Sequence, residues 1–417
     1  MIRPDLEATG TMPFESDTSR REFLHGSLAA VGSLSAASLV RADEGDDAPN
    51  DQKAAEPPLP TRKLGRSGIP VSILNQGCAV KLTARLLDYA YSRGVRYFDT
   101  ADCYGRGQSE KTIARWFEKT GKRKEIFLVT KCHPHKGPAQ MLDLLDERLE
   151  ALKTDYIDLL FMHALCDDEY PAESVDWVKS DEYKQTAEKL KQTGKVKLVG
   201  FSIHADARAQ ALMNAAEAGF VDAIMVKYDP RTAKDDKMNR ALDACAKAGI
   251  GLIAMKTQSS AKAFEERWKK HKQGDWTVQQ AVVKAVLSDD RLAGMTSHME
   301  NLKQIDQNTA AARDVKPLAR ADHDLLMRLY AEGPHRLCEC GGGCAEAVGR
   351  PSALHDVARF VMYHDLYGRR DWARDGYRSL RPELIDLSAE ELHRAKAACG
   401  DAIDYPAIFA RARTALA

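Results

Sequence analysis

The sequence has little of what marks nucleic-acid-binding, membrane-spanning or disulfide-rich proteins. Its 417 residues carry 61 Lys plus Arg and 61 Asp plus Glu, so the formal net charge is zero. The basic excess of a nucleic-acid binder is therefore missing. No run of about eighteen apolar residues occurs, which excludes an ordinary membrane-spanning helix. Nine cysteines are too few for a disulfide scaffold, whereas the hydrophobic content of 44% is enough for a sizeable core.

The first sixty residues differ in composition from the rest of the chain. Arg20-Arg21 precedes a weakly apolar stretch at residues 26–40 and a small residue, Ala42. A basic region, an apolar region and a small-residue site in this order predict an export signal at residues 1–42. A disordered basic tail is the alternative. Residues 43–60 are acidic and then proline-rich, which predicts a linker.

The paired arginines of the predicted signal resemble the twin-arginine type, which is recognised as an address. Such signals serve proteins that fold before they are exported. The resemblance therefore implies the twin-arginine export machinery as a partner, and a periplasmic or otherwise exported location.

From residue 61 onward, short apolar runs alternate with amphipathic stretches. Continuously apolar runs between amphipathic helices are typical of parallel strands covered by helices. Eight such units predict a closed (β/α)8 TIM barrel at residues 61–315. An open doubly wound sheet is the alternative, but no G-x-G-x-x-G follows the first strand. The predicted strands are 71–77, 96–99, 126–131, 156–162, 196–202, 223–226, 250–255 and 292–295.

Residues 316–417 show helical periodicity and predict a helical C-terminal extension. Its unusual feature is a glycine-rich segment in which Cys338, Cys340 and Cys344 lie within seven residues. Three thiols on such a loop can converge on a metal.

Polar side chains stand at the ends of three consecutive predicted strands. Asp99 ends one strand and Tyr104 follows it, Lys131 ends the next, and His163 follows the third. Barrel active sites form where strands end, so these side chains are expected to converge. Each also has a structural explanation, since Asp99 could cap a helix, Lys131 could be a solvated strand end and His163 could be structural.

The chemistry of this set fits carbonyl reduction. A neighbouring ammonium lowers the pKa of a phenol, which is a poor acid at its ordinary value. A carboxylate holds the ammonium, and a histidine orients the carbonyl oxygen or assists proton transfer. Tyr104 then protonates the oxygen while a hydride reaches the carbon. Because no side chain supplies a hydride, the reaction needs a cofactor.

Motifs around these residues resemble the aldo-keto reductase family. Residues 62–68 resemble its N-terminal hairpin, and residues 94–105 with Ser109-Glu110 resemble its best-known motif. Residues 152–163 and 194–202 continue the likeness, which covers roughly residues 61–315. The resemblance implies a catalytic tetrad and NADP, or less often NAD, across the barrel mouth. The implied tetrad is Asp99, Tyr104, Lys131 and His163.

The resemblance further implies a small-molecule aldehyde or ketone, or the corresponding alcohol, as substrate. Some cofactor positions depart from the family pattern, because Ile203 replaces an Asn and Met225 replaces a Gln. A stacking Tyr is also replaced by Met255-Lys256, and only Lys303 is near the expected 2′-phosphate contacts. The choice between NADP and NAD therefore stays open. The implied cofactor contacts are Ser202, Met255, Lys256, Gly294, Thr296 and Ser297.

The cysteine segment resembles the ferredoxin-like C-x2-C-x2-C-x3-C-P extension of some family members. Cys340 is one place off, and Val348 and Gly349 stand where the fourth Cys and the Pro are expected. A 4Fe-4S cluster, a disulfide with a spare thiol, an incomplete metal site and a purely structural loop all stay open. We therefore assign no metal ligand from the sequence.

Two other functions also stay open. One is a non-catalytic nicotinamide-binding or sensing protein on the same scaffold. The other is an iron-sulfur electron-transfer oxidoreductase that uses the segment 338–344.

Overall fold

The computed structural model describes residues 55–79, 82–166, 170–171, 173–258, 261–332, 343–365, 370–399 and 403–417. The predicted export signal, most of the predicted linker, Cys338 and Cys340 lie outside these residues.

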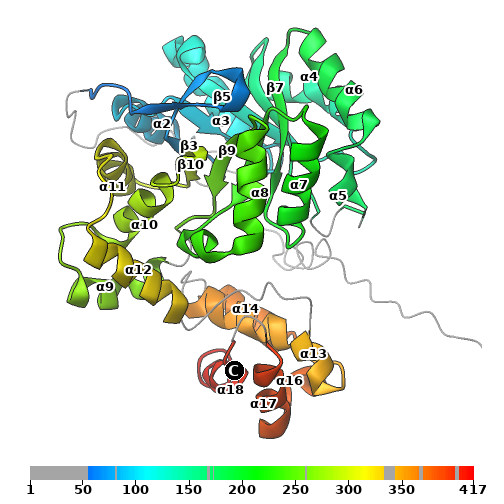
Figure 1. Cartoon of the computed structure of the whole chain (residues 1–417), viewed down its shortest axis with the longest axis vertical. Coiled ribbons are helices and arrows are strands. Elements are labelled where there is room, and N and C mark those ends of the chain that lie inside the picture. The colour runs from blue at the N-terminus through cyan, green and yellow to red at the C-terminus, as the bar shows by residue number, and fades with distance from the viewer. Residues whose placement is uncertain are drawn as a thin grey trace, which may run out of the picture. The chain divides into compact units, whose positions relative to one another are not determined.

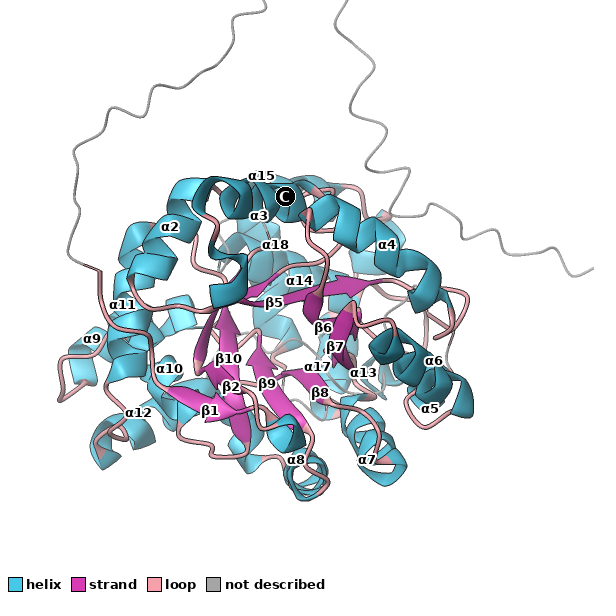
Figure 2. Cartoon of the chain, turned by 90° about the horizontal axis from the view of Figure 1, so that it is seen from above, coloured by secondary structure: helices cyan, strands magenta, loops and turns pink. Residues whose placement is uncertain are grey.

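Eight parallel strands close into a barrel in the order β10-β3-β4-β5-β6-β7-β8-β9. Figure 2 shows these strands enclosed by helices. The predicted (β/α)8 barrel with helices after it is therefore confirmed. The strands are β3 (Leu74–Gly77), β4 (Tyr97–Asp99), β5 (Phe127–Cys132), β6 (Ile157–Met162), β7 (Val196–Ile203), β8 (Ala223–Lys227), β9 (Gly251–Met255) and β10 (Leu292–Ser297).

The barrel helices begin at side chains that satisfy otherwise unpaired backbone N–H groups. Thr83 accepts a hydrogen bond from the Leu86 N–H, and Ser180 accepts one from the Tyr183 N–H. Helices α7 and α8 pack side by side (Figure 1). The helices are α2 (Ala84–Ser92), α3 (Gln108–Thr120), α4 (Gln140–Leu152), α5 (Ser174–Trp177), α6 (Asp181–Gln192), α7 (Arg208–Ala218), α8 (Asp236–Lys247), α9 (Glu265–His271), α10 (Val278–Leu287), α11 (Leu302–Arg313) and α12 (Arg320–Glu332).

A short hairpin precedes the barrel. Its strands β1 (Thr61–Lys63) and β2 (Pro70–Ser72) pair antiparallel. The predicted strand 71–77 is therefore two strands, interrupted at Ile73. Leu64, fully buried, ends the hairpin's first arm and packs against Gly251, where an added Cβ would lie 2.4 Å from the Leu64 Cδ1. This leucine closes the barrel at the amino ends of its strands.

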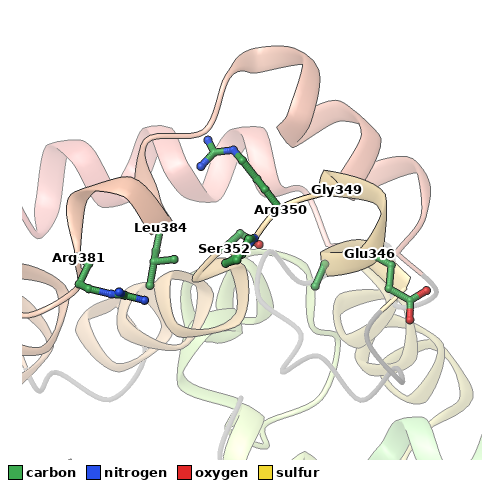
Figure 3. A pocket seen from close by; sticks show the side chains of 8 residues that line it. Glu346, Gly349, Arg350, Ser352, Arg381 and Leu384 are labelled. Atoms are coloured by element: carbon green, nitrogen blue, oxygen red, sulfur yellow. The ribbon is translucent and has the colours of Figure 1, made fainter. Parts of the chain in front are cut away.

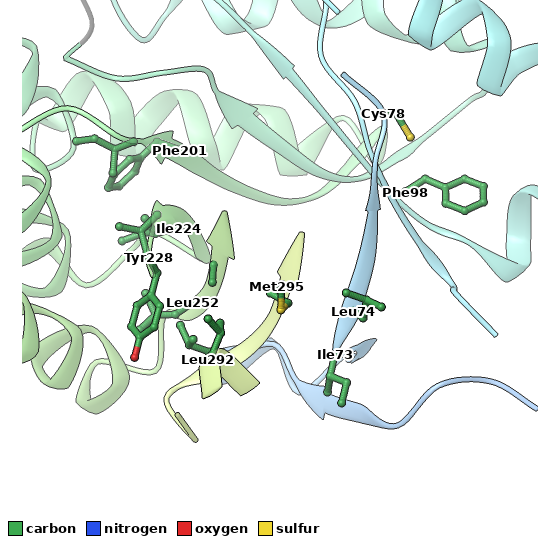
Figure 4. Packing of buried hydrophobic residues seen from close by; sticks show 14 of the residues in the cluster. Ile73, Leu74, Cys78, Phe98, Phe201, Ile224, Tyr228, Leu252, Leu292 and Met295 are labelled. Carbon is green, nitrogen blue, oxygen red and sulfur yellow. The ribbon is translucent and has the colours of Figure 1, made fainter. Parts of the chain in front are cut away.

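The largest apolar core fills the space between the strands and the surrounding helices. Figure 4 shows members of this core on β3, β4, β7, β8, β9 and β10, including Leu74, Phe98 and Leu252. The same core includes Leu326 and Tyr330 of α12. This helix, beyond residue 315, thus packs with the barrel.

The first described residues are fastened beside the amino ends of the strands. Glu56 Oε1 lies 2.6 Å from Arg93 Nη1, and its Oε2 lies 2.7 Å from Arg313 Nε. The Glu56 N–H donates to the Ser92 carbonyl at 2.8 Å. Gly94 has φ 85°, and an added Cβ there would lie 2.4 Å from the Pro57 carbonyl oxygen. A glycine is therefore required where this segment crosses the chain entering β4.

The C-terminal helices have an apolar core of their own, which includes Val357, Tyr405 and Phe409. One finding differs from the sequence analysis, because Cys344 lies in a helix and not on a loop. The helices are α13 (Gly343–Val348), α14 (Leu354–Asp365), α15 (Arg370–Arg378), α16 (Pro382–Ile385), α17 (Ala389–Ala397) and α18 (Tyr405–Ala415).

A pocket in this helical region is lined by Glu346, Arg350 and Arg381 among others (Figure 3). The guanidinium of Arg350 is engaged by the protein itself, because its Nε donates to Glu391 Oε1 at 2.6 Å. Its Nη atoms donate to the carbonyls of Glu383 and Asp386 at 2.8 and 2.7 Å. Arg350 thus ties three helix ends together.

None of the helices in the described ranges combines the length and apolar character that crossing a membrane requires.

Candidate active site

Lys131 stands at the centre of a hydrogen-bonded group at the carboxyl ends of β4 and β5. Its side chain is 1% exposed, and its Nζ donates to Asp99 Oδ1 at 2.7 Å. The same Nζ donates to the Thr100 carbonyl at 2.8 Å and to the Tyr104 hydroxyl at 3.4 Å. The structure thus brings together three of the four residues predicted to be catalytic.

The loop after β4 is held against β5 by backbone hydrogen bonds. The Thr100 N–H donates to the Val129 carbonyl at 2.9 Å, and the Asp102 N–H to the Lys131 carbonyl at 3.1 Å. The Tyr104 N–H then closes a turn on the Ala101 carbonyl at 3.2 Å. Because this turn doubles back over the strand end, the Tyr104 ring lies 4.8 Å from the Lys131 Nζ.

His163 joins the group from the next strand. Its backbone N–H donates to the Cys132 carbonyl at 2.9 Å, directly after β6 ends. Its ring meets the Tyr104 ring edge to face, with centroids 5.6 Å apart and an interplanar angle of 77°. All four predicted tetrad residues therefore lie at the ends of three neighbouring strands.

Burial and charge fix the protonation states here. Burial disfavours the ammonium, but the Asp99 carboxylate and the Tyr104 hydroxyl together outweigh it and hold the pKa of Lys131 above its usual value. Burial raises the pKa of the Tyr104 phenol, and the Lys131 charge lowers it by a smaller amount. From the sequence, the ammonium is expected to have the larger effect on the pKa of Tyr104. Because burial dominates instead, the phenol keeps its proton at neutral pH.

His163 is a neutral imidazole. Burial, the charge of Lys131 and the nearby His133 ring hold its pKa well below the usual range. A neutral ring has one N–H donor and one acceptor nitrogen, so His163 can donate a hydrogen bond at the barrel mouth without adding charge.

A second polar group, missed in the sequence analysis, adjoins the tetrad. His133, two residues beyond Lys131, places its Nδ1 2.9 Å from Asp102 Oδ1. The His163 Nδ1 lies 3.7 Å from the Cys103 Sγ and 4.0 Å from Asp102 Oδ1. Ligand atoms of these four residues all lie within 4.8 Å of one another. The histidine immediately after the end of β5 was the signal available in the sequence.

Two predicted cofactor residues use their hydroxyls inside the protein. The Ser202 Oγ accepts from the Ala164 N–H at 2.9 Å. The Ser297 Oγ donates to Gln258 Oε1 at 2.6 Å and accepts from Asn308 Nδ2 at 3.0 Å. These hydroxyls lie near the strand ends but position neighbouring segments.

The other predicted cofactor residues differ in their surroundings. The Thr296 Oγ1 is buried and has no hydrogen-bond partner among the residues that the structure describes. Gly294 lies inside β10, where an added Cβ would be 2.9 Å from the Ile73 carbonyl oxygen. Met255 ends β9, and Lys256 follows it with φ 56° and an exposed side chain.

Positive charge gathers beyond the ends of β7, β8 and β9. Burial and then the charges of Lys256, Lys227 and Arg208 lower the pKa of His204 to about 4. These three cations therefore act together on one half-buried ring. Such a concentration of positive charge suits the phosphates of a dinucleotide.

The barrel matches a known enzyme family. A family model described as the aldo/keto reductase family matches residues 77–321. The chain is a member of this family, which confirms the resemblance found in the sequence.

Individual relatives share about 30% sequence identity with less than half of this chain. The aldo-keto reductase yakc [NADP(+)] of Schizosaccharomyces pombe is 29% identical over 217 residues, which cover 47% of this chain and 60% of that protein. An uncharacterized oxidoreductase, YrpG of Bacillus subtilis, is 30% identical over 46% of this chain and 64% of that protein. The chain thus spans less than two thirds of the length of these relatives.

Solved structures share the fold. An aldo-keto reductase from Klebsiella pneumoniae in complex with NADPH has a TM-score of 0.53 and 22% identity, over 65% of this chain and 95% of that one. The holo form of an aldo-keto reductase from Bacillus halodurans has a TM-score of 0.53 and 21% identity, over 65% of this chain and 96% of that one.

Proposed function

We propose that the protein is an oxidoreductase that reduces an aldehyde or ketone, or oxidises the alcohol, with NADP(H). The observation that carries this proposal is the position of Lys131, whose Nζ lies between Asp99 Oδ1 and the Tyr104 hydroxyl at 2.7 and 3.4 Å. A buried phenol beside a buried ammonium can give up a proton without forming an isolated charge.

The barrel mouth fits a nicotinamide dinucleotide. Lys227, Lys256 and Arg208 would hold its phosphates, because their charges converge near His204. The unpartnered Thr296 Oγ1 offers a further polar contact. When bound, such a cofactor supplies the hydride that no side chain can provide. Two similar proteins, the aldo-keto reductase yakc [NADP(+)] and the Klebsiella pneumoniae reductase in complex with NADPH, favour NADP over NAD.

The residues divide the proton chemistry among them. Tyr104 donates its proton to the carbonyl oxygen, and Lys131 stabilises the phenolate that forms. Asp99 keeps Lys131 charged throughout. The neutral His163 ring lies edge to face against Tyr104 and donates a hydrogen bond that fixes the carbonyl oxygen beside the phenol.

Replacing Tyr104 tests this mechanism. Tyr104→Phe removes one hydroxyl, and we expect kcat to fall by about 100- to 10,000-fold, the usual contribution of a general acid. The assay follows NADPH oxidation against a panel of aliphatic and aromatic aldehydes and ketones. Tyr89→Phe is the matched control, since the Tyr89 hydroxyl pairs with Asp306 on the barrel's outer helices. Equal kcat in Tyr104→Phe and the parent protein would refute the mechanism.

A second candidate is a protein that binds the nicotinamide cofactor without turnover. The Ser202 and Ser297 hydroxyls are engaged within the protein and would not orient the nicotinamide ring for hydride transfer, which favours binding without turnover. Mass spectrometry of the natively purified protein tests it. Retained NADP(H) together with no reduction of any carbonyl in the panel would support this function over catalysis.

We also propose that the protein is exported after folding, on the strength of Arg20-Arg21 and the weakly apolar stretch after it. Cell fractionation compares the parent with Arg20→Lys/Arg21→Lys. The parent should leave the cytoplasm and the variant should remain there. Retention of both proteins in the cytoplasm would contradict export.

A further inference from the structure

We propose that Asp102, Cys103, His133 and His163 bind one divalent transition-metal cation, best matched by zinc, at the mouth of the barrel. No metal ligand was assigned from the sequence, and the proposed reductase chemistry uses none. The proposal does not depend on the proposed function, because its test measures metal binding and not turnover.

The four candidate ligand atoms lie close enough together to share one ion. One atom from each residue, a carboxylate oxygen, a thiol sulfur and two ring nitrogens, lies within 4.8 Å of the other three. Zinc–ligand bonds of about 2.0–2.3 Å place tetrahedral ligands roughly 3.3–3.8 Å apart. The Asp102–His133, Cys103–His163 and Asp102–His163 separations are 2.9, 3.7 and 4.0 Å. Side-chain movements below about 1 Å complete the tetrahedron.

The scaffold around the cluster is rigid. Asp102 and Cys103 lie on the loop after β4, which is pinned to β5 by the bond from the Asp102 N–H to the Lys131 carbonyl. His133 directly follows β5 and His163 directly follows β6. The His133 and His163 rings are already adjacent, with centroids 4.4 Å apart. Ligands from three neighbouring strand ends therefore already lie together, and binding an ion requires little rearrangement of their side chains.

The donor set selects the kind of ion. Two imidazoles and a thiolate are poor ligands for magnesium or calcium, which take oxygen donors, and good ligands for zinc and cobalt. Four protein ligands fill a tetrahedron, which is the arrangement of structural and not catalytic zinc sites. The cation is therefore assigned a positioning role.

Binding has a defined proton balance. The cation bonds to the Cys103 sulfur as the S–H bond breaks, and the thiol proton passes to water. The bond to His133 Nδ1 replaces the hydrogen bond of that atom with Asp102 Oδ1, and the Nδ1 proton passes through water to Nε2 of the same ring. Coordination through His163 Nδ1 leaves the ring proton on Nε2. The cation thereby fixes the tautomer of a ring that lies against Tyr104.

Cobalt substitution provides a direct readout. The full-length protein carries Cys338→Ser/Cys340→Ser to remove the other thiol cluster, is stripped with chelator, and is titrated with cobalt and then zinc. We expect one equivalent of cobalt to give the visible bands of a tetrahedral ion and thiolate-to-metal charge-transfer absorption, both removed by zinc.

Matched variants locate the site. Cys103→Ser should abolish the charge-transfer absorption, and His133→Ala should weaken zinc binding by at least about 100-fold. The controls are Cys166→Ser, a thiol after the same strand as His163, and His135→Ala, whose ring stacks on His133 with centroids 5.7 Å apart. Both controls should bind as the parent does.

Two results would overturn the proposal. One is the absence of cobalt and zinc binding at micromolar concentrations in the parent. The other is an unchanged charge-transfer absorption in Cys103→Ser. Circular dichroism of each stripped variant shows that it is folded before titration, so that a lost signal reports lost ligands.

Discussion

The buried pair of Lys131 and Asp99 makes a quantitative prediction about stability. Lys131→Met keeps most of the side-chain volume but removes the charge from a group that is 1% exposed. It leaves the Asp99 carboxylate, 3% exposed, without its ammonium, and leaves the Thr100 carbonyl without the donor at 2.8 Å. Breaking a buried ion pair on one side costs about 3–5 kcal/mol of the free energy of unfolding.

Removing both charges should cost less than removing one. In Lys131→Met/Asp99→Leu no uncompensated charge remains, and apolar replacements of buried pairs are often close to neutral. We therefore expect the double variant to be more stable than either single variant, with a coupling energy of at least about 2 kcal/mol.

Equilibrium urea unfolding measures this cycle. The fluorescence of Trp116 and Trp268, fully buried in the barrel core, reports the barrel, whereas Trp372 is 44% exposed on the C-terminal helices. If the losses in the free energy of unfolding of the two single variants simply add in the double variant, the two side chains do not interact. That result would refute the reasoning.

Two further predictions concern the barrel wall. Burial raises the pKa of Glu110 from 4.5 to about 7, with Asp102 adding to the rise and Arg148, the Thr130 hydroxyl and Lys131 opposing it. Between these pH values the folded protein holds a proton that the unfolded chain has lost, so the free energy of unfolding should fall by about 3 kcal/mol as pH rises. Urea unfolding of the parent and of Glu110→Gln across this pH range isolates the contribution of Glu110 as the difference between the two profiles. Identical profiles would contradict the prediction. Gly200→Ala would place a Cβ 1.9 Å from the Ala223 carbonyl oxygen, whereas Gly121 has nothing within 4 Å. Thermal denaturation should therefore show a loss of more than about 3 kcal/mol for Gly200→Ala and a much smaller one for Gly121→Ala.

The sequence was sufficient for the barrel because its signals are local. Each apolar run and each amphipathic helix can be recognised within about a dozen residues, and the closed barrel follows from their number. The meeting of Asp99, Lys131 and His163 followed from the same alternation, since the carboxyl ends of parallel strands share one face. The interruption at Ile73 was missed because the apolar run continues through it.

Long-range partners were beyond the sequence. The Ser297 hydroxyl is held by Gln258 and Asn308, and these hydrogen bonds form only in the folded chain, so they could not be predicted from the sequence. The pKa of Tyr104 depends on how completely the folded loop covers it, and this burial reversed the expected direction. The grouping of Asp102 with His133 likewise arises only when the loop after β4 folds back on β5.

The ion pairs of Glu56 with Arg93 and Arg313 hold the segment at residues 55–57 beside the amino ends of the barrel strands. Arg93 lies between α2 and β4, and Arg313 ends α11. Both therefore lie at the amino ends of the strands, on the barrel face opposite Tyr104 and Lys131. If the chain is shortened to begin at residue 55, a carrier domain, a surface linkage or an affinity handle joined there would therefore start from the amino ends of the strands. Immobilisation through that end should leave the mouth accessible to substrates.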